Sequence, residues 1–261
     1  MIFPYACMRE LLPFMSEEAK NKAFSAMPAL RGVFCFVFPY FTGGEKGNLS
    51  LYARGEDYHN VVIKKLGEYV SELKSRYPDN EFIPYADKSP FPEVRAAACA
   101  GLGKIGKNGL LLTEKYGSFV FIGVIATDLE GESICEPAFC EGCGACIEAC
   151  PTGAISENGV CVDRCVSELT QRKGELTPQQ REIIKKSPTV WGCDVCQLVC
   201  PYNASIEETD IEGFSKEIIR DISLSDLQMS NRAFMKKYGD RAFAWRGITP
   251  LRRNLEIKEE K

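Results

Sequence analysis

Hydrophobic residues recur along the first half of this chain with two different periods. The run Gly32–Pro39 is apolar, aromatic and β-branched, and the Gly43–Gly44 break follows it, so it predicts a buried strand with a loop after it. Between Val61 and Leu73, apolar residues return every three or four positions, which predicts a helix with one buried face. Both kinds of element are therefore expected before residue 80.

Further segments extend this alternation to residue 127. Ser16 is typical of a helix N-cap. The segment Glu81–Asp87 predicts a short strand that a proline-containing loop stops, and Glu93–Leu102 predicts a helix of small residues. Leu110–Thr113 and Ser118–Thr127 predict two strands around a turn. The alternation favours an α/β or α+β architecture, and it puts Asp87 at a strand end, where a side chain can face a cleft.

Composition and charge narrow the class of protein. The chain has 261 residues, 45% hydrophobic and 26% charged, which is ordinary for a globular protein with one large or two smaller domains. No apolar run reaches membrane-spanning length, and a net charge of −4 limits nucleic-acid binding to a local basic patch. The single histidine, His59, excludes a catalytic site built on two or three histidines.

Eight of the thirteen cysteines lie between residues 140 and 200 at spacings typical of iron-sulfur proteins. The first run reproduces the bacterial ferredoxin spacing, including a proline after its fourth cysteine. The second run gives three ligands before Pro201, and Cys165 is the candidate for a fourth. In two-cluster ferredoxins the cysteine before proline ligates the other cluster, which predicts two ligand sets. These are Cys140, Cys143, Cys146 and Cys200 for one cluster, and Cys150, Cys165, Cys193 and Cys196 for the other.

Disulfides and zinc are the competing interpretations of these cysteines. Disulfides need an exported chain, and Met1 is not followed by a signal peptide pattern, so we expect a reducing cytoplasm. Zinc sites usually consist of two spaced pairs, whereas both runs here end in Cys-Pro, which favours clusters. Five cysteines fit no ligand set and are expected to be core or incidental thiols: Cys7, Cys35, Cys99, Cys135 and Cys161.

Two other segments each allow two interpretations. Gly101–Gly109 holds four glycines and two lysines, which is typical either of a flexible loop or of a ligand cradle. It is not a Walker loop, and its Gly-x-Gly-x-x-Gly letters follow a predicted helix where a dinucleotide site requires a strand. Arg232–Arg253 carries seven basic residues interleaved with aromatic ones, as in a nucleic-acid grip or in a packed helix with solvated lysines.

Further short motifs follow one another in order over roughly residues 30 to 255. They are Tyr52-Ala-Arg54-Gly, Asp57-Tyr-His59, Asp87-x-x-Pro90 with Glu93, Ala100-Gly-Leu-Gly103 with Lys107-Asn108, Tyr116-Gly-Ser118, Thr127-Asp-Leu129, Gly192-Cys-Asp194-x-Cys-Gln197 and Arg253-Asn254. With the two cysteine runs, these motifs make the chain resemble the epoxyqueuosine reductases.

The resemblance implies an α+β fold in which a nitroreductase-like cobalamin-binding domain precedes a ferredoxin-like double [4Fe-4S] domain. It divides the chain into residues 1–131, residues 132–205, and a basic helical extension of residues 206–261 that packs on the first two domains. The family removes the epoxide oxygen of epoxyqueuosine in tRNA. The resemblance therefore implies a cytoplasmic oxidoreductase of queuosine biosynthesis, in which clusters deliver electrons and the corrin metal performs the difficult step.

The resemblance also implies roles for single residues. Asp87 matches the family's catalytic carboxylate and would act as general acid toward the departing oxygen, with a pKa raised by burial beside the corrin. His59 is either a structural histidine or a site residue, and we do not expect it to ligate cobalt. The full set expected at the cofactor is Tyr52, Arg54, His59, Gly103, Lys107, Asn108 and Ser118. Ordinary surface side chains are the alternative for Arg54 and Lys107.

Partners follow from the same resemblance. We expect tRNA at the basic C-terminal stretch, a flavodoxin or ferredoxin as electron donor, no membrane association and a monomer. The chain departs from the family in its short N-terminus, in Val94 where an Arg usually follows the residue matching Glu93, and in ending at Lys261 without the helical repeats of the long form. A corrinoid reductase for another small substrate, or an electron carrier or corrinoid-reactivating protein, are the alternatives.

Overall fold

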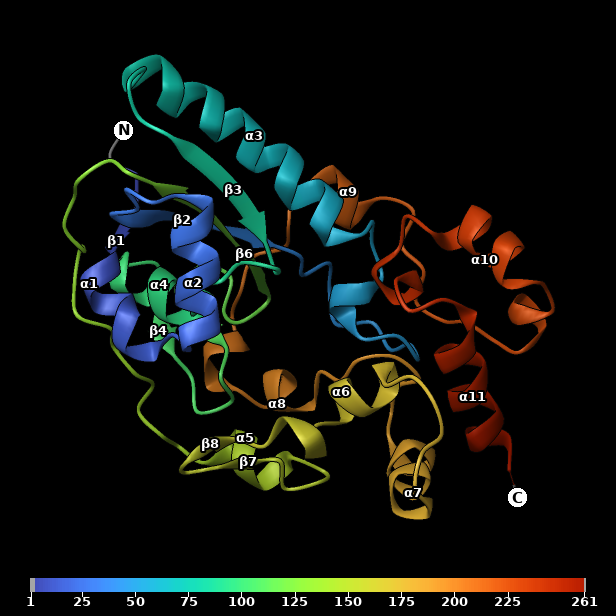
Figure 1. Ribbon diagram of the computed structural model, residues 1–261. Helices are drawn as coiled ribbons and strands as arrows, with labels where there is room; N and C mark the ends of the chain where they lie inside the picture. The colour runs from blue at the N-terminus through green and yellow to red at the C-terminus, as the bar shows by residue number, and fades with distance from the viewer. Residues whose placement is uncertain (1–2, 261) are drawn as a thin grey trace. The chain divides into compact units, whose positions relative to one another are not determined.

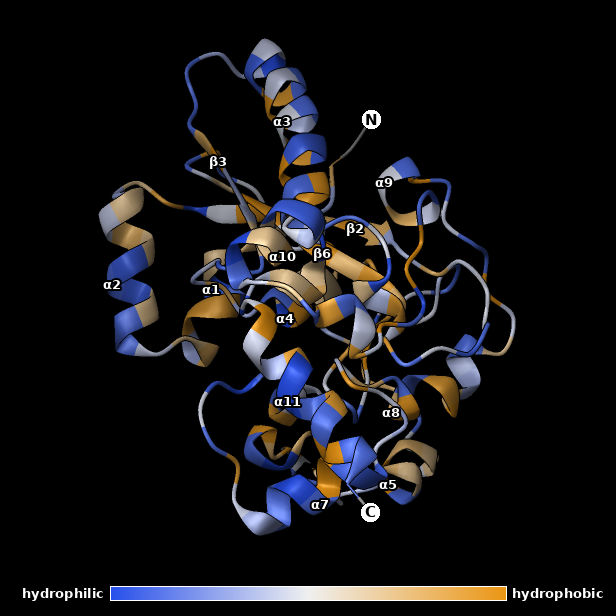
Figure 2. Cartoon of the chain, turned by 90° about the vertical axis from the view of Figure 1, so that its right-hand side faces the viewer, coloured by the Kyte–Doolittle hydropathy of each residue, from blue (hydrophilic) through white to orange (hydrophobic). Residues whose placement is uncertain are grey.

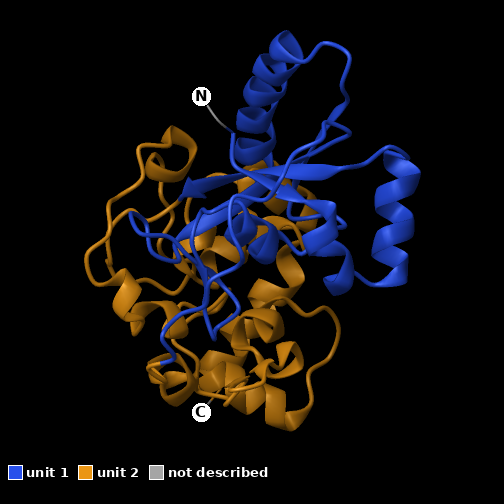
Figure 3. Ribbon diagram, turned by 90° about the vertical axis from the view of Figure 1, so that its left-hand side faces the viewer, with its two compact units in different colours: residues 1–39, 59–142 blue, residues 40–58, 143–261 orange. Residues whose placement is uncertain are grey.

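The computed structural model describes residues 3–260, which form two compact units. The first unit combines residues 1–39 with residues 59–142, and the second combines residues 40–58 with residues 143–261 (Figure 3). The chain therefore leaves the first unit after residue 39 and returns to it at residue 59. The division at residues 131 and 205 that the resemblance implies stays a prediction.

The first unit is a mixture of strands and helices (Figure 1). Its strands are β1 (Tyr5–Cys7), β2 (Gly32–Pro39), β3 (Phe82–Ala86), β4 (Lys104–Ile105), β5 (Leu111–Leu112) and β6 (Val120–Thr127). Its helices are α1 (Met8–Leu11), a 3₁₀ turn (Leu12–Phe14), α2 (Glu17–Ala26), α3 (Tyr58–Arg76) and α4 (Glu93–Cys99). Ser16 caps α2 as predicted, because its side chain accepts a hydrogen bond from the Ala19 amide at 3.1 Å.

Four of these strands form one antiparallel sheet in the order β1-β2-β6-β3. The longest pairing joins β2 to β6 from Gly32 opposite Thr127 to Pro39 opposite Val120. The central strand β2 is apolar at nearly every position because both of its faces are covered. Phe36 stacks on Tyr69 of α3 with ring centroids 4.2 Å apart, whereas Cys35, on the opposite face, belongs to a core beneath α4.

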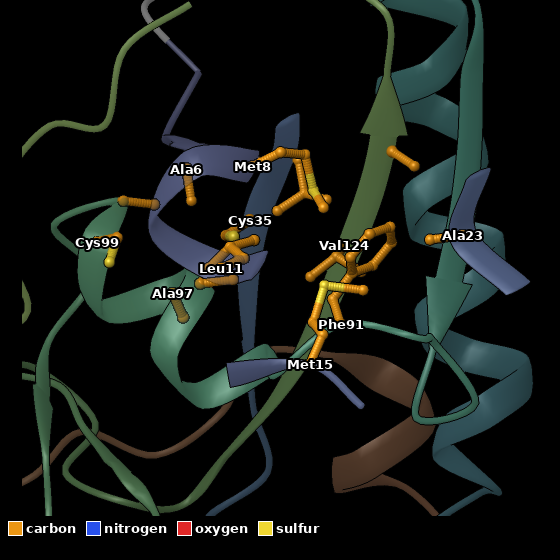
Figure 4. Close-up of a cluster of buried hydrophobic side chains, with 14 of the residues drawn as sticks. Ala6, Met8, Leu11, Met15, Ala23, Cys35, Phe91, Ala97, Cys99 and Val124 are labelled. Atoms are coloured by element: carbon orange, nitrogen blue, oxygen red, sulfur yellow. The ribbon is translucent and has the colours of Figure 1, made fainter. Parts of the chain in front are cut away.

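Close packing on both faces fixes where the ends of the sheet lie. A Cβ atom on Gly123 of β6 would approach Val62 and Leu66 of α3 to 3.0 Å or less, so the glycine allows the helix to lie directly on the strand. On the other face, Leu11, Cys35 and Ala97 gather between α1, α4 and the sheet (Figure 4). The small side chains predicted for Glu93–Leu102 are the reason that α4 can pack so closely.

The second unit has short helices and little sheet. Its elements are α5 (Ala145–Ala149), β7 (Ile155–Ser156), β8 (Gly159–Val160), α6 (Val166–Gln171), α7 (Pro178–Lys186), α8 (Val195–Leu198), α9 (Glu212–Ser215), α10 (Asn231–Tyr238) and α11 (Ile248–Glu259). Short 3₁₀ turns lie at Leu51–Ala53, Val162–Arg164, Pro201–Asn203, Ser225–Leu227 and Ala242–Ala244. Its main core contains Trp191, Phe234 and Phe243, all fully buried. In Figure 2, β2 and β6 are mostly hydrophobic in colour, whereas α7 is mostly hydrophilic.

The elements predicted from hydrophobic period agree with the structure to within a few residues. The strand Gly32–Pro39 is confirmed, and the helix predicted over Val61–Leu73 is α3, which is longer at both ends. The sequence analysis predicted no strand before residue 30, where β1 pairs with β2. Among residues 3–260, no helix combines the length and the apolar character needed to cross a membrane.

Candidate active site

The carboxylate of Asp87 stands just beyond the end of β3 and contacts the only histidine of the chain. His59 Nε2 lies 3.2 Å from Asp87 Oδ2. Asp87 has a left-handed backbone conformation, with φ +64°, which an Asp tolerates better than most residues. This turn points the acid away from the strand, and its side chain is 57% exposed. His59 comes from the first turn of α3, so two elements that flank the sheet supply the pair.

A second acid belongs to the same group. Glu93 lies in the first turn of α4, and its Oε1 atom is buried without a hydrogen-bond partner. Burial raises the pKa of Glu93 to about 7; a hydrogen bond with Ser89 lowers this pKa, the charge of Asp87 raises it further and His59 lowers it. Three titratable side chains therefore influence one another here. The sequence analysis quoted Glu93 within a motif and gave it no role, because burial of a carboxyl group leaves no pattern in the sequence.

The glycine-rich stretch forms a β-hairpin, in which Lys104–Ile105 pairs with Leu111–Leu112. A Cβ on Gly103 would lie 2.4 Å from the Leu112 carbonyl oxygen, so this glycine is required by the hairpin itself. Asn108 accepts a hydrogen bond from the Leu110 amide at 3.3 Å, whereas its buried Nδ2 has no hydrogen-bond partner. An unpaired buried amide is costly, and a bound ligand would satisfy it. The geometry therefore supports a hairpin that presents Asn108 to a ligand.

Two further residues expected at the cofactor lie in the first unit. Ser118 is buried just before β6. The Lys107 side chain passes Gly142, whose hypothetical Cβ would lie 2.9 Å from Lys107 Cε. Together with His59, Gly103 and Asn108, they make five of the seven expected cofactor residues that belong to this unit.

Tyr52 and Arg54, the remaining two, belong to the second unit. Arg54 is buried and donates to the carbonyl oxygens of Leu49 at 2.9 Å and Glu45 at 2.7 Å. Its guanidinium thus holds the local loop, which is a structural role. The neighbouring carboxylate of Asp194 accepts from Ser50 Oγ at 2.6 Å and from the Leu51 amide at 2.9 Å.

Asp194 is a structural residue that the sequence analysis did not single out. It lies between two cluster cysteines and ties their loop to the segment around residue 51. Burial raises the pKa of Asp194, while Ser50, the Leu51 amide and the charge of Arg54 lower it. A buried acid with these donors fixes the loop that carries Cys193 and Cys196.

The cysteine loops of the second unit lie against one another through α5 and α8, which contain Cys146 and Cys196. Cys193 is close to Cys165 and Cys150: burial raises the pKa of Cys193 to about 11, and the charges of Cys165 and Cys150 also raise it. These three belong to one predicted ligand set, and Cys150 comes from the first run. Their proximity agrees with the crossed assignment, in which the cysteine before a proline serves the other cluster.

The eight cysteines meet the chemical requirements of cluster ligands. All thirteen thiols of the chain are free, so none of the eight is used in a disulfide. Among the described residues, no three His, Cys, Asp or Glu side chains converge on a single metal ion, whereas a cubane cluster takes one thiolate at each iron. Cys140 belongs to the first unit, where its amide donates to Ile105 of β4 at 3.0 Å. The other seven belong to the second.

The basic C-terminal stretch is largely structural. Arg241 is buried in ion pairs with Glu217 and Asp240, both at 3.4 Å. The Arg252 side chain donates to the carbonyl oxygens of Leu227 and Met229. Of the seven basic residues interpreted as a nucleic-acid grip, these two cannot meet a phosphate without breaking internal bonds.

Arg253 is committed in the same way. It donates to the carbonyl oxygens of Arg172 at 2.7 Å and Gly174 at 2.9 Å, and burial lowers its pKa. Arg232, Lys236 and Lys237 are exposed, and Arg246 is partly exposed. The packed-helix interpretation therefore holds for part of the stretch only, because the last three basic residues of α10 remain at the surface.

Trp245 and Arg246 form an exposed stack near the start of α10. The Arg246 guanidinium lies 3.7 Å from the centroid of the Trp245 ring, and Trp245 is 47% exposed. Its indole nitrogen donates to Gln171 Oε1 at 3.1 Å. The Ile248 amide donates to Asn231 Oδ1 at 3.0 Å, which holds this loop against the first residue of α10. A rigid aromatic face thus lies beside Arg232 and Lys236.

Comparison with known proteins decides the family. A family model described as "Epoxyqueuosine reductase QueG, DUF1730" matches residues 22–88, and a "4Fe-4S double cluster binding domain" matches residues 139–203. The epoxyqueuosine reductase of Synechocystis sp. is 35% identical over 217 residues, which cover 78% of this chain and 73% of that protein. The chain belongs to the epoxyqueuosine reductase family. It therefore contains a domain that binds two iron-sulfur clusters.

Other family members differ in length. The epoxyqueuosine reductase of Lactococcus garvieae is 36% identical over 225 residues, which cover 83% of this chain and 62% of the relative. For that of Listeria monocytogenes the covered share of the relative is 57%. The chain thus spans about three fifths of the length of these two relatives.

Solved structures of the family share the fold. The epoxyqueuosine reductase of Streptococcus thermophilus superimposes with a TM-score of 0.79 at 28% identity, over 94% of this chain and 69% of that one. A crystal structure of an epoxyqueuosine reductase with an epoxyqueuosine-modified tRNA-Tyr stem loop gives a TM-score of 0.74 at 28% identity, over 90% and 66% of the two chains. The mixed helix and strand architecture is thus that of the family.

Proposed function

We propose that this chain reduces epoxyqueuosine in tRNA to queuosine, with two [4Fe-4S] clusters and a cobalamin. The observation that carries the proposal is the pairing of Asp87 with His59 at a strand end, in a chain that also contains a double-cluster domain. An acid held by a histidine is the group that a leaving epoxide oxygen needs. The family relatives and the neighbour crystallised with a modified tRNA stem loop support the substrate.

The reaction converts an epoxide to an alkene and releases the oxygen as water, which consumes two electrons and two protons. The clusters and cobalamin would supply the electrons at the carbon centre. Asp87 donates a proton to the oxygen as the carbon-oxygen bond breaks, and His59 orients its carboxyl group. A Bacillus subtilis relative, 28% identical with a TM-score of 0.76, is described with its catalytic aspartate loop swung out of the active site, which supports an Asp in this role.

Cobalamin would be held by a nitroreductase-like domain through His59, Gly103, Lys107, Asn108 and Ser118, with Tyr52 and Arg54 as the remaining contacts. The orphan Nδ2 of Asn108 is the donor best suited to a cofactor amide or phosphate oxygen. Arg54 would act by holding its loop, since its guanidinium is engaged with backbone carbonyls.

The cluster ligands follow the crossed pattern. Cys150, Cys165, Cys193 and Cys196 hold one cluster, and Cys140, Cys143, Cys146 and Cys200 hold the other. The mutual influence of Cys150, Cys165 and Cys193 supports the first set. A flavodoxin or ferredoxin would reduce the clusters in the cytoplasm, where tRNA is modified, with the enzyme acting as a monomer.

The tRNA would be gripped by Trp245, Arg246, Arg232 and Lys236. An exposed indole stacks on an unpaired base, and the neighbouring cations meet phosphates. The seven-residue grip inferred from the sequence is thereby reduced to the side chains that stay at the surface. Arg252 and Arg253 would contribute only to the stability of the unit, because their guanidinium groups are bound to carbonyl oxygens.

The test is anaerobic incubation of the cluster-reconstituted protein with cobalamin, a strong reductant and tRNA that contains epoxyqueuosine. Nucleosides are then read by mass spectrometry. Queuosine formed by the wild type and lost in Asp87→Asn is the expected result. Cobalamin binding without queuosine would overturn the substrate and favour a corrinoid reductase for another molecule.

A further inference from the structure

The proposed reaction needs two protons, and Asp87 can deliver only one before it must be recharged. Glu93 is the one acid whose charge acts on the Asp87–His59 pair in the described residues of the first unit and to which the mechanism assigns no role. Its Oε1 is buried without a hydrogen-bond partner, although a purely structural buried carboxyl group would normally have its oxygens satisfied. An acid with this exposure can store a proton near neutral pH.

We propose that Glu93 supplies the second proton of each turnover by recharging Asp87. This inference rests on the proposed function. Asp87 gives its proton to the epoxide oxygen as the first carbon-oxygen bond breaks. Glu93 then reprotonates Asp87, which gives the second proton as the other carbon-oxygen bond breaks. Two electrons from the reduced clusters complete the alkene, water leaves, and Glu93 regains a proton from solvent.

The surroundings of Glu93 fit a proton store. Asp87 and His59 act on it from the β3–α4 loop and from α3, and the thiol of Cys35 faces it from β2. The other charged groups near α4, Glu10 and Arg95, act on Cys99 at the far end of the helix. Burial raises the pKa of Glu93 to about 7, so near neutral pH it can both hold and release a proton.

The position also explains how the store is protected. Asp87 is more than half exposed, whereas the Glu93 Oε1 is buried beside the close-packed Ala96–Cys99 part of α4. Solvent can reach Asp87 and exchange its proton, but the proton on Glu93 is shielded. A shielded acid keeps the second proton available after the site has closed on its substrate.

The first experiment compares Glu93→Gln with wild type in single-turnover queuosine formation between about pH 5 and pH 9. We expect a loss of about 10²-fold at neutral pH, a change in the alkaline limb of the rate profile, and partial rescue by a small added acid such as imidazolium. Glu10→Gln is the matched control and keeps the wild-type profile. A wild-type rate and profile in Glu93→Gln, or a uniform loss without rescue, overturns the proposal.

The second experiment does not depend on turnover. Infrared titration of the wild type should show a carboxyl C=O band that disappears on ionisation near pH 7 and is missing in Glu93→Gln. If Glu93→Gln fails to fold or to load clusters, Glu93→Asp replaces it and should retain the band at a shifted pH. A wild type without such a band overturns the inference even if it makes queuosine. A wild type that has the band and makes none refutes the proposed function instead.

Discussion

The two units of this protein hold their chemistry in opposite ways. In the first, a four-stranded sheet covered on both faces positions Asp87, His59 and Glu93 at the ends of regular elements. In the second, cysteines lie on short helices and loops, and the aromatic core around Trp191 and Phe234 is made by other segments. A backbone that is held by its own ladder needs no ligand, whereas loops without one gain order from the metal they bind.

The comparison teaches where damage should spread. Loss of a side chain in the first unit should change chemistry and leave the fold, because the sheet is closed by many independent pairings. Loss of a ligand in the second should change both together. Five measurements would break or sharpen this contrast, from complete loss of function to a change in one salt dependence.

Removal of a cluster ligand should have the largest effect. Cys193→Ser should lose one cluster and abolish queuosine formation, because that cluster loses a thiolate and its loops lose their anchor. Cys150→Ser should disturb the same cluster, as the crossed assignment requires. Iron counting and EPR measure both, and Cys161→Ser, an exposed cysteine outside both sets, is the control. A different cluster lost in the two variants would contradict the assignment.

Asp87→Asn should lower the rate of queuosine formation by about 10²- to 10⁴-fold, which is the usual contribution of a general acid. Both clusters should remain, since the side chain stands beyond the end of β3 and more than half of it is exposed. Single-turnover kinetics and the EPR spectrum report the two quantities separately. Asp79→Asn, on the exposed loop before β3, is the control. Loss of iron in Asp87→Asn would break the contrast between the units.

Stability of the first unit should fall as pH rises from about 5 to 8. Glu93 keeps its proton in the folded state up to about pH 7 but loses it near its ordinary value of 4.5 when unfolded. Its burial therefore costs nothing at low pH and its full amount above pH 7. At about 1.4 kcal/mol per tenfold change in proton affinity, the cost is roughly 3 kcal/mol.

Glu93→Gln should flatten that slope. Urea unfolding of the full chain, followed by circular dichroism, measures the difference between variant and wild type at several pH values. Both tryptophans, Trp191 and Trp245, lie in the second unit, so their fluorescence reports that unit separately. A pH slope that is the same in the two proteins would show that Glu93 is not protonated in the folded state.

Trp245→Ala should weaken binding of the epoxyqueuosine-containing stem loop by about 1 to 3 kcal/mol, the usual contribution of one base stacked on an aromatic ring. Trp245→Phe keeps a flat aromatic face and should retain most of the affinity. Fluorescence anisotropy of a labelled stem loop gives both values. Equal affinities for the wild type and Trp245→Ala would remove the stack from the RNA surface.

Arg246→Ala should give the smallest effect, a decrease of about one in the slope of log affinity against log salt concentration. Arg252→Ala is the matched control, because the Arg252 guanidinium is bound to the carbonyl oxygens of Leu227 and Met229. It should lower the stability of the second unit and leave the salt slope unchanged. The opposite pattern would restore the broader grip inferred from the sequence.

Local patterns in the sequence were sufficient for the elements and for the family. The strand Gly32–Pro39 follows from an apolar run bounded by proline and glycine, since both its faces are covered. The cysteine spacing predicted a double-cluster domain because ligand spacing is set along the chain itself. The glycine-rich stretch was harder: its two interpretations did not include a hairpin, because two-residue strands are too short to show a period.

The sequence by itself determined the strand and helix periods, the cluster motif and the family, because these are properties of neighbouring residues. Only the tertiary structure decided which charged side chains are buried. It brings Glu93 into contact with the field of Asp87 and His59, and it commits Arg252 and Arg253 to internal carbonyl oxygens. A pKa or a free guanidinium depends on desolvation by segments far apart in the chain, and no local pattern encodes which distant segments will meet.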